Sequence, residues 1–201
     1  MGKQLIVAIS REFGSGGHEI AEKIAHELGI EFYDRSMLDE TANEMNVKVE
    51  LIEKYDEKPK SYILSRRVGK YTNSMEEIIA ETQFDFIKKK AEKGDSFVIV
   101  GRCAESVLRD FDGLVTIFIG GEKEHKKKRV MKKYNLGEAE AVLKMSRHDR
   151  RRKTYYNRHS DSKWGDSRHY DVCINSSPLG VEGTVKVLIN YIRERIGTDE
   201  A

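Results

Sequence analysis

The sequence predicts an α/β fold, a three-layer sandwich in which helices cover both faces of a parallel sheet. Short apolar runs of strand length alternate with longer segments of helical periodicity. The runs are continuously apolar, which is typical of strands covered on both faces. The first run leads through a glycine-rich turn directly into a helix. Because crossovers between parallel strands are right-handed, the sandwich is the simplest topology for this order.

The N-terminal part of the chain predicts a strand, a loop and a helix in immediate succession. The strand is the apolar run 5–9, and the segment 10–17 after it ends in three glycines and a serine. Apolar residues then recur at helical spacing from Ile20 to Leu28, and Gly29 ends the helix.

The rest of the chain continues the alternation. In order, we expect a short extension at 31–33, a helix capped by Asp34 or Ser36, a helix from 74 to 94, strands at 97–100, 114–119 and 172–174, and a C-terminal helix at 185–196. Ser74 and Glu77 form the capping box of the second of these helices. Residues 47–73, which include Pro59, lack periodicity and are predicted to be a mobile flap.

Composition favours one soluble domain spanning residues 1–201. Hydrophobic residues make up 38% and charged residues 35% of the chain, and no apolar run approaches the roughly 18 residues of a membrane span. The strand-like run at the N-terminus ends in Arg11-Glu12 and not in a small-residue cleavage site, so we expect no export signal. The two cysteines, Cys103 and Cys173, lack metal-binding spacing and are expected to be reduced thiols of a cytoplasmic protein. The oligomeric state is left open.

Positive charge is concentrated near the C-terminal third of the chain. The net charge is only +2, but residues 147–169 hold eight Lys and Arg against three Asp. Like charges at helical spacing repel one another, and a bound anion would relieve that repulsion. We therefore expect a basic, mobile lid at about 145–169 that closes over a phosphate-bearing ligand.

The glycine-rich turn predicts a phosphate-binding loop. Small residues at Gly14, Ser15, Gly16 and Gly17 let backbone N–H groups turn toward an anion at a helix N-terminus. We expect the amides of residues 15–18 to face one point. The usual motif continues with a lysine and a hydroxyl residue, whereas here Gly17 or His18, and then Glu19, stand in those places. The alternative is a tight turn with no ligand.

The sequence resembles the cytidylate kinase-like family of P-loop proteins nearly from end to end. The resemblance is carried by the opening segment 9–17, by Phe32-Tyr33-Asp34-Arg35, by Gly101-Arg102, by the basic segment 147–153, by Trp164-Gly165-Asp166 and by the segment 170–175. It implies a P-loop nucleoside-kinase-like fold with a helical lid. It also implies transfer of the γ-phosphoryl group of ATP to CMP or dCMP.

Aligned on the glycines, the sequence departs from true cytidylate kinases at five chemically sensitive places. Gly17 replaces the loop lysine, Glu19 the magnesium-binding hydroxyl and Val100 an aspartate at the strand end. In the lid, Arg151 stands at an acidic position and Thr154 at an arginine position. The resemblance therefore supports the fold more directly than it supports CMP phosphorylation.

Three groups of candidate site residues follow. We expect Arg147, Arg150 and Arg151 to be catalytic, Arg11, Gly14, Ser15, Gly16, Gly17 and His18 to bind ATP, and Asp34, Arg35 and Arg102 to bind the acceptor. Any Mg²⁺ is expected to arrive on the nucleotide, and its protein ligands are left open. Each residue also has a structural alternative. Arg11 could pair with Glu12, His18 could be a solvated first-turn residue and Asp34 could be a helix cap.

Two other functions remain open at this stage. One is a non-catalytic nucleotide- or phosphate-binding module, which the missing lysine and hydroxyl favour. The other is nucleic-acid binding. The basic segment favours it, but this segment lacks the interleaved aromatic residues that stack on bases. The lysines around residue 126 are expected to form a solvated helix face, and Trp164 to pack at the end of the lid.

Overall fold

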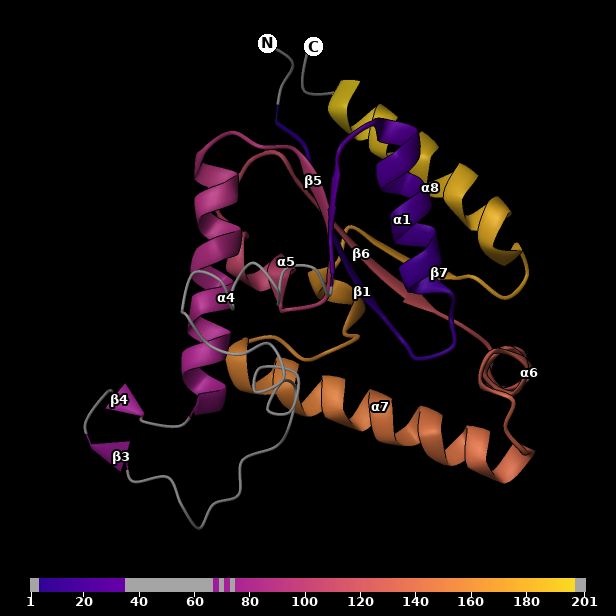
Figure 1. The fold of residues 1–201 in the computed structure, drawn as a ribbon. Helices are drawn as coiled ribbons and strands as arrows, with labels where there is room; N and C mark the ends of the chain where they lie inside the picture. The colour runs from indigo at the N-terminus through magenta and orange to yellow at the C-terminus, as the bar shows by residue number, and fades with distance from the viewer. Residues whose placement is uncertain (1–3, 35–66, 69–70, 73–74, 198–201) are drawn as a thin grey trace.

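The computed structural model describes residues 4–34, 67–68, 71–72 and 75–197 (Figure 1). Five parallel strands form one sheet in the order β2-β5-β1-β6-β7. These strands are β1 (Ile6–Arg11), β2 (Glu31–Tyr33), β5 (Phe97–Val100), β6 (Leu114–Gly120) and β7 (Val172–Asn175). A separate two-stranded ladder pairs β3 (Arg67–Val68) with β4 (Tyr71–Thr72). The predicted α/β fold with a parallel sheet is confirmed.

The first strand is longer than the apolar run that predicted it. It continues through Ser10 and Arg11, which pair in register with Phe118 and Ile119 of β6. The sequence pattern missed these two positions because they are polar, although the backbone ladder continues. As a result, Arg11 belongs to the carboxyl end of the central strand and not to the loop.

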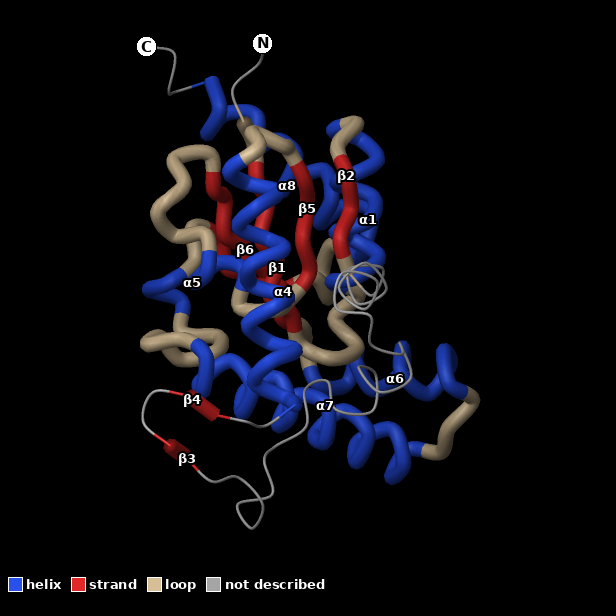
Figure 2. Tube along the Cα trace, turned by 60° about the vertical axis from the view of Figure 1, so that its left-hand side comes forward, coloured by secondary structure: helices blue, strands red, loops and turns tan. Residues whose placement is uncertain are grey.

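Helices lie on both faces of the sheet and beyond its carboxyl edge (Figures 1 and 2). They are α1 (Gly17–Leu28), α4 (Met75–Glu92), α5 (Ala104–Val107), α6 (Lys123–Tyr134), α7 (Glu138–His159) and α8 (Gly180–Gly197), with a 3₁₀ turn at Ser167–His169. None of the helices in the described part of the chain is long and apolar enough to span a membrane.

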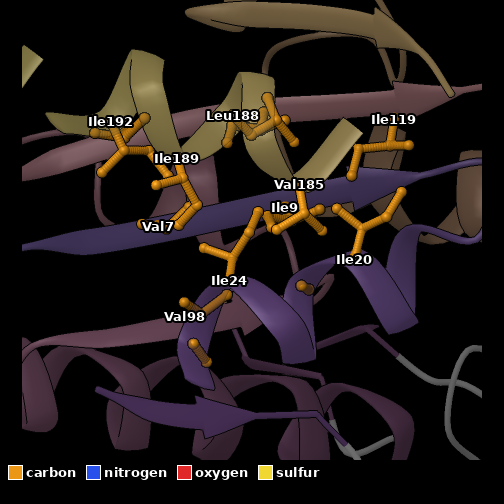
Figure 3. Close-up of a cluster of buried hydrophobic side chains, with 14 of the residues drawn as sticks. Val7, Ile9, Ile20, Ile24, Val98, Ile119, Val185, Leu188, Ile189 and Ile192 are labelled. Atoms are coloured by element: carbon orange, nitrogen blue, oxygen red, sulfur yellow. The ribbon is translucent and has the colours of Figure 1, made fainter. Parts of the chain in front are cut away.

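Alternation along β1 separates the two layers of the core. Val7 and Ile9 face α1 and α8, where they meet Ile24 and Leu188 (Figure 3). The intervening residues face the other layer, which α4 and α5 cover with Phe86, Ile87, Ala104 and Leu108. Because both faces are covered there, all four residues of β5 are buried, as its apolar run predicts. In β6 buried residues alternate with half-buried ones, and in β7 half-buried residues alternate with exposed ones, so continuous burial is wrong for these two strands.

A third and smaller apolar cluster connects the sheet to α6 and α7, which lie beyond the carboxyl ends of the strands (Figure 1). Phe13 from the glycine-rich loop packs with Val130 of α6 and with Ala141 and Met145 of α7. The loop is thus part of an apolar contact with the helix that begins the predicted lid.

Two sequence-based predictions lie wholly or largely outside the described residues. They are the helix capped by Asp34 or Ser36 and the mobile flap at 47–73, of which only β3 and β4 are described.

Candidate functional site

The glycine-rich loop joins the end of β1 to the start of α1. Gly14 has φ +87° and Gly16 has φ +82°, both in the left-handed region that favours glycine. At Gly14 a Cβ would also lie 2.9 Å from Cγ2 of Val130. The loop is tethered to the end of the edge strand β7, because the hydroxyl of Ser176, the residue after this strand, donates to the Ser15 carbonyl oxygen at 2.6 Å. Its backbone shape therefore depends on these glycines and on this tether.

Two of the four amides expected to meet an anion are used within the loop. The Ser15 N–H donates to the Glu12 carbonyl oxygen at 3.4 Å, and the Gly17 N–H donates to the Ser15 hydroxyl oxygen at 3.3 Å. The prediction is therefore wrong for Ser15 and Gly17. Both bonds are long, and the reason for them is the tight turn that folds Ser15 back onto Glu12. For Gly16 and His18 it stays a prediction.

A cavity of about 490 Å³ opens against this loop. Four cationic side chains line it: Arg11 from β1, Arg129 and Lys133 from α6, and Arg152 from α7. Three carboxylates, Glu12, Glu19 and Glu22, line it as well. The cavity lies at the carboxyl edge of the parallel strands, where ligands of open α/β sheets gather.

One of the two α6 cations, Arg129, lies beside the loop. Arg129 forms an ion pair with Glu19, and its Cζ would lie 3.5 Å from a Cβ on Gly16. Sequence reasoning did not select Arg129. It places a guanidinium over the residue that caps α1, close to where phosphate oxygens would sit.

The prediction that the lysines around residue 126 form a solvated helix face is wrong for Lys126. Its side chain is 9% exposed, and its Nζ donates to Oε2 of Glu12 at 2.7 Å. The same oxygen accepts from the Gly121 N–H at 3.0 Å. Glu12 therefore needs Lys126 as its counter-charge, which the lysine run alone did not reveal. The sequence offered Arg11 as an alternative partner for Glu12, and the structure gives Glu12 the partner Lys126.

The two sides of α7 differ in their relation to the cavity. Arg152 lines it, and its Nη1 donates to the Arg11 carbonyl oxygen at 3.1 Å. Asp149, one turn earlier, accepts from the Phe13 N–H at 2.7 Å. Burial raises the pKa of Asp149 above its ordinary value, although the Phe13 hydrogen bond opposes this. Together these bonds attach α7 to both ends of the β1-to-loop junction.

The three arginines expected to be catalytic lie on the other side of that helix. Arg147, Arg150 and Arg151 are exposed, and none of them lines the described cavity. The physical reason is helical phase, because these positions point away from the stripe formed by Met145, Asp149, Arg152 and Tyr156. That stripe was readable in the sequence, since Arg152 follows Met145 by seven residues and precedes Tyr156 by four.

The structure brings together one residue expected to bind ATP and one expected to bind the acceptor. His18 contacts the Asp34 carboxylate, and its ring meets the edge of Phe32 with centroids 5.4 Å apart. Asp34 thus has a partner at the start of α1. Arg35 lies outside the described residues.

Arg102 lies at a second, much smaller opening. Together with Gly101, Cys103 and Trp164 it lines a crevice of about 20 Å³, which Arg11 and Arg152 also border. Arg102 has φ +59°, an uncommon conformation for arginine. The crevice has room for about one water molecule, so a nucleoside monophosphate would need it to widen. Trp164 packs edge-on against Phe118, as its expected packing role implies.

A buried carboxylate lies beneath this crevice. Glu105 accepts hydrogen bonds from the Ser10 hydroxyl at 2.6 Å and from the Tyr170 hydroxyl at 3.0 Å. Burial raises the pKa of Glu105, while these two bonds and the charge of Arg11 act against the rise. Sequence reasoning missed Glu105, because a lone glutamate after a strand carries no recognisable pattern.

The side chains near the loop that could coordinate a metal ion are few in the part of the chain that the structure describes. The described residues contain no group of three His, Cys, Asp or Glu side chains that could hold an ion. Mg²⁺ commonly binds through one or two carboxylates, water and substrate phosphates. Glu19 and Glu22 line the cavity, so the carboxylates present would fit a metal brought in by a nucleotide.

Comparison with known proteins agrees with this architecture. The crystal structure of an uncharacterized protein from Eubacterium ventriosum is 39% identical in sequence, with a TM-score of 0.75 over 94% of this chain and 99% of that one. Shikimate kinase from Bacteroides thetaiotaomicron is 12% identical, with a TM-score of 0.56 over 94% of this chain and 98% of the kinase. Shikimate kinase from Aquifex aeolicus is 15% identical, with a TM-score of 0.50 over 94% and 97%.

The two shikimate kinases share the fold, and their low identity supports no more than that. No curated protein matches the sequence significantly. The family model of the cytidylate kinase-like family matches residues 6–178, which include every strand of the sheet, the glycine-rich loop and α7. The chain therefore belongs to the cytidylate kinase-like family.

Proposed function

We propose that this protein transfers the γ-phosphoryl group of ATP to a small acceptor, with CMP or dCMP as the first acceptor to test. The observation that carries the proposal is the 490 Å³ cavity, in which four cationic side chains surround a glycine-rich loop at a helix N-terminus. Backbone dipoles and arginine side chains suit phosphate oxygens. Family membership supports a nucleotide-binding phosphotransferase at a coarser level.

Phosphoryl transfer requires the protein to position the reactants and to neutralise charge, and it requires little covalent participation by the protein. An acceptor phosphate oxygen forms a bond to the γ-phosphorus while the bond to the β–γ bridging oxygen breaks, and ADP leaves with that electron pair. Bound Mg²⁺ would neutralise phosphate charge in this step. From this chain, Gly16 and His18 would orient the phosphates by their amides, and Arg129 would contact them from α6.

We assign different roles to the arginines of α7. Arg152 already borders both the cavity and the crevice, so we assign it to the region between donor and acceptor. Arg147, Arg150 and Arg151 would reach the nucleotide only if α7 moved. For the acceptor, Arg102 and Asp34 remain the proposed contacts, and Arg35 joins them as a proposal from sequence alone.

A non-catalytic nucleotide-binding module is the second candidate function. It is favoured by Gly17, which brings no charge to the loop, and by the ion pair that already engages Glu19 with Arg129. In that case ATP would bind in the same cavity without being consumed.

One experiment separates these functions. ATP consumption is measured against a panel of nucleoside monophosphates, with and without Mg²⁺, and ATP binding is measured by calorimetry on the same protein. Consumption with CMP or dCMP supports the proposal, and consumption with another acceptor changes only the acceptor. Binding without any consumption identifies the binding module. If ATP does not bind, both are wrong, and salt-dependent retention of oligonucleotides then tests the nucleic-acid alternative.

A further inference from the structure

The backbone conformation of Gly17 does not require a glycine. Gly17 is the first residue of α1 and is not among the residues with positive φ, so its conformation would accept any side chain. A Cβ at this position, however, would lie 2.6 Å from Cβ and 3.0 Å from Cγ of Arg11. The side chain of Arg11 therefore occupies the space into which a residue at position 17 would extend.

The far end of Arg11 meets a second glycine. A Cβ on Gly101 would lie 2.6 Å from Nη1 of Arg11. Gly101 follows β5, and its N–H donates to the Ile9 carbonyl oxygen of β1 at 3.0 Å. The stem of Arg11 thus lies beside the start of α1, and its guanidinium lies at the end of the neighbouring strand.

This path places the charge of Arg11 between two openings. Arg11 lines the 490 Å³ cavity and also the crevice that contains Arg102. Arg152 borders both as well and donates to the Arg11 carbonyl oxygen. A phosphoryl group moving from a donor in the cavity to an acceptor at the crevice would pass this guanidinium.

We propose that Arg11 takes the place of the loop lysine that Gly17 lacks, so that its guanidinium contacts the γ-phosphate of a bound nucleoside triphosphate. The assignment rests on the proposed function, because it needs a triphosphate in the cavity. It explains Gly17, since a side chain there would collide with the stem of Arg11. Gly101 is already favoured by its φ of +85°, and its lack of a Cβ also leaves room for the guanidinium. Arginine also suits this location, because its charge persists when partly buried and its planar fork binds two phosphate oxygens at once.

A purely structural role is the competing explanation. The positive charge of Arg11 acts on buried Glu105, opposing the rise of its pKa. Arg11 could then serve only to fill space and to balance that carboxyl group. Charge and packing must therefore be varied separately in the test.

The test moves the charge back to the loop. In Arg11→Gly/Gly17→Lys the arginine stem is removed and a lysine is placed at position 17. Arg11→Gly/Gly17→Met supplies a stem of similar size without the charge. Glycine is needed at position 11, because the Cβ of an alanine there would still collide with that of residue 17. Arg11→Met and Arg11→Lys form a second pair, and Lys153→Met on the exposed side of α7 is the control.

The readouts are calorimetric affinities for ATP and for ADP, with thermal unfolding of each free protein. We expect Arg11→Met to weaken ATP binding by about 10- to 100-fold and ADP binding by much less, because the lost contact is to the γ-phosphate. The lysine double variant should regain the preference for ATP over ADP, and the methionine double variant should not. If the double variants do not fold, Arg11→Lys should keep the preference that Arg11→Met loses.

The outcomes separate this assignment from the proposed function. A parent protein that does not bind ATP overturns both. A parent that binds ATP while Arg11→Met keeps the ATP preference overturns only the assignment. The same holds if the lysine and methionine double variants behave alike, because Arg11 would then act through packing.

Discussion

Two sides of one helix, α7, carry the same kind of residue and have very different surroundings. On the inner side, the Arg152 side chain is 15% exposed and donates to the backbone of Arg11. It also lies over the Phe13 ring, with its Cζ 5.5 Å from the centroid. On the outer side, Arg147, Arg150 and Arg151 face solvent. Of four arginines within six residues, one therefore has surroundings unlike those of the other three.

The difference shows that the density of charge along the chain does not reveal which charged side chain faces the cavity. A dense basic segment only favours the binding of an anion, and every arginine in it adds equally to the charge density. Which arginine reaches the anion depends on the helical phase relative to the apolar stripe, here Met145 and Tyr156. An exposed arginine is screened by water and salt, whereas a largely buried one acts through a lower dielectric.

The comparison predicts its largest effect at Arg152. Arg152→Met keeps much of the side-chain volume and removes the guanidinium, so we expect turnover of ATP with its acceptor to fall by about 100-fold, as when one preorganised charge is lost from an active site. Steady-state kinetics measure this, with Lys153→Met as the control on the exposed side. Turnover within twofold of the parent would show that the inner side has no special role.

The next effect is on stability and concerns Asp149. Asp149→Ala leaves the partly buried Phe13 N–H without its 2.7 Å partner, which should lower the free energy of unfolding by about 1–2 kcal/mol. Urea unfolding measures it. Asp161→Ala, at an exposed position beyond the end of α7, should change stability by less than about 0.5 kcal/mol. Equal effects for the two variants would mean that α7 is not held to the loop through Asp149.

Much of the fold could be predicted because short apolar runs mark the strands, even where, as in β6, only alternate residues are buried. All five strands of the sheet correspond to runs or extensions visible in the sequence, and α1 ends at Gly29 as expected. The extension of β1 to Arg11 was missed, since pairing with β6 depends on backbone groups and not on the side-chain pattern.

The site was harder to predict, because its cations come from distant parts of the chain. Arg129 and Lys126 lie in a lysine-rich stretch that reads as solvated, yet the sheet order places that stretch against the loop. Arg152 could have been selected by phase, whereas Glu105 depends on the hydroxyls of Ser10 and Tyr170 converging in three dimensions. Spacing in one sequence does not encode such convergence.

A smaller effect is expected in the pH dependence of stability. Because burial raises the pKa of Asp149 above its ordinary value of 3.8, the folded protein holds a proton there at pH values where the unfolded chain has lost it. Stability contributed by this group therefore falls as pH rises from 3.8 through the raised pKa. Asp149→Asn keeps an oxygen acceptor for Phe13 and cannot titrate.

Relative to that variant, the parent should lose stability as pH rises. Urea unfolding of both proteins from about pH 3.5 to about pH 7 measures the difference. If the parent instead gains stability over this interval, the attraction of Arg152, whose Nη1 lies 3.8 Å from Asp149 Oδ1, outweighs burial.

The smallest effect is expected from the outer side of α7, and it decides whether that helix moves. Arg150→Ala and Arg151→Ala remove exposed charges whose contacts are worth below about 1 kcal/mol, so each should lower turnover by less than about fivefold. Neither should weaken ATP binding measurably, because these side chains lie away from the cavity in the described conformation. Kinetics at two salt concentrations sharpen the test, since a loss caused only by long-range attraction shrinks as salt rises. A loss as large as that of Arg152→Met, and insensitive to salt, would contradict the comparison. It would show instead that α7 closes over the nucleotide and brings its outer arginines to the phosphates during turnover.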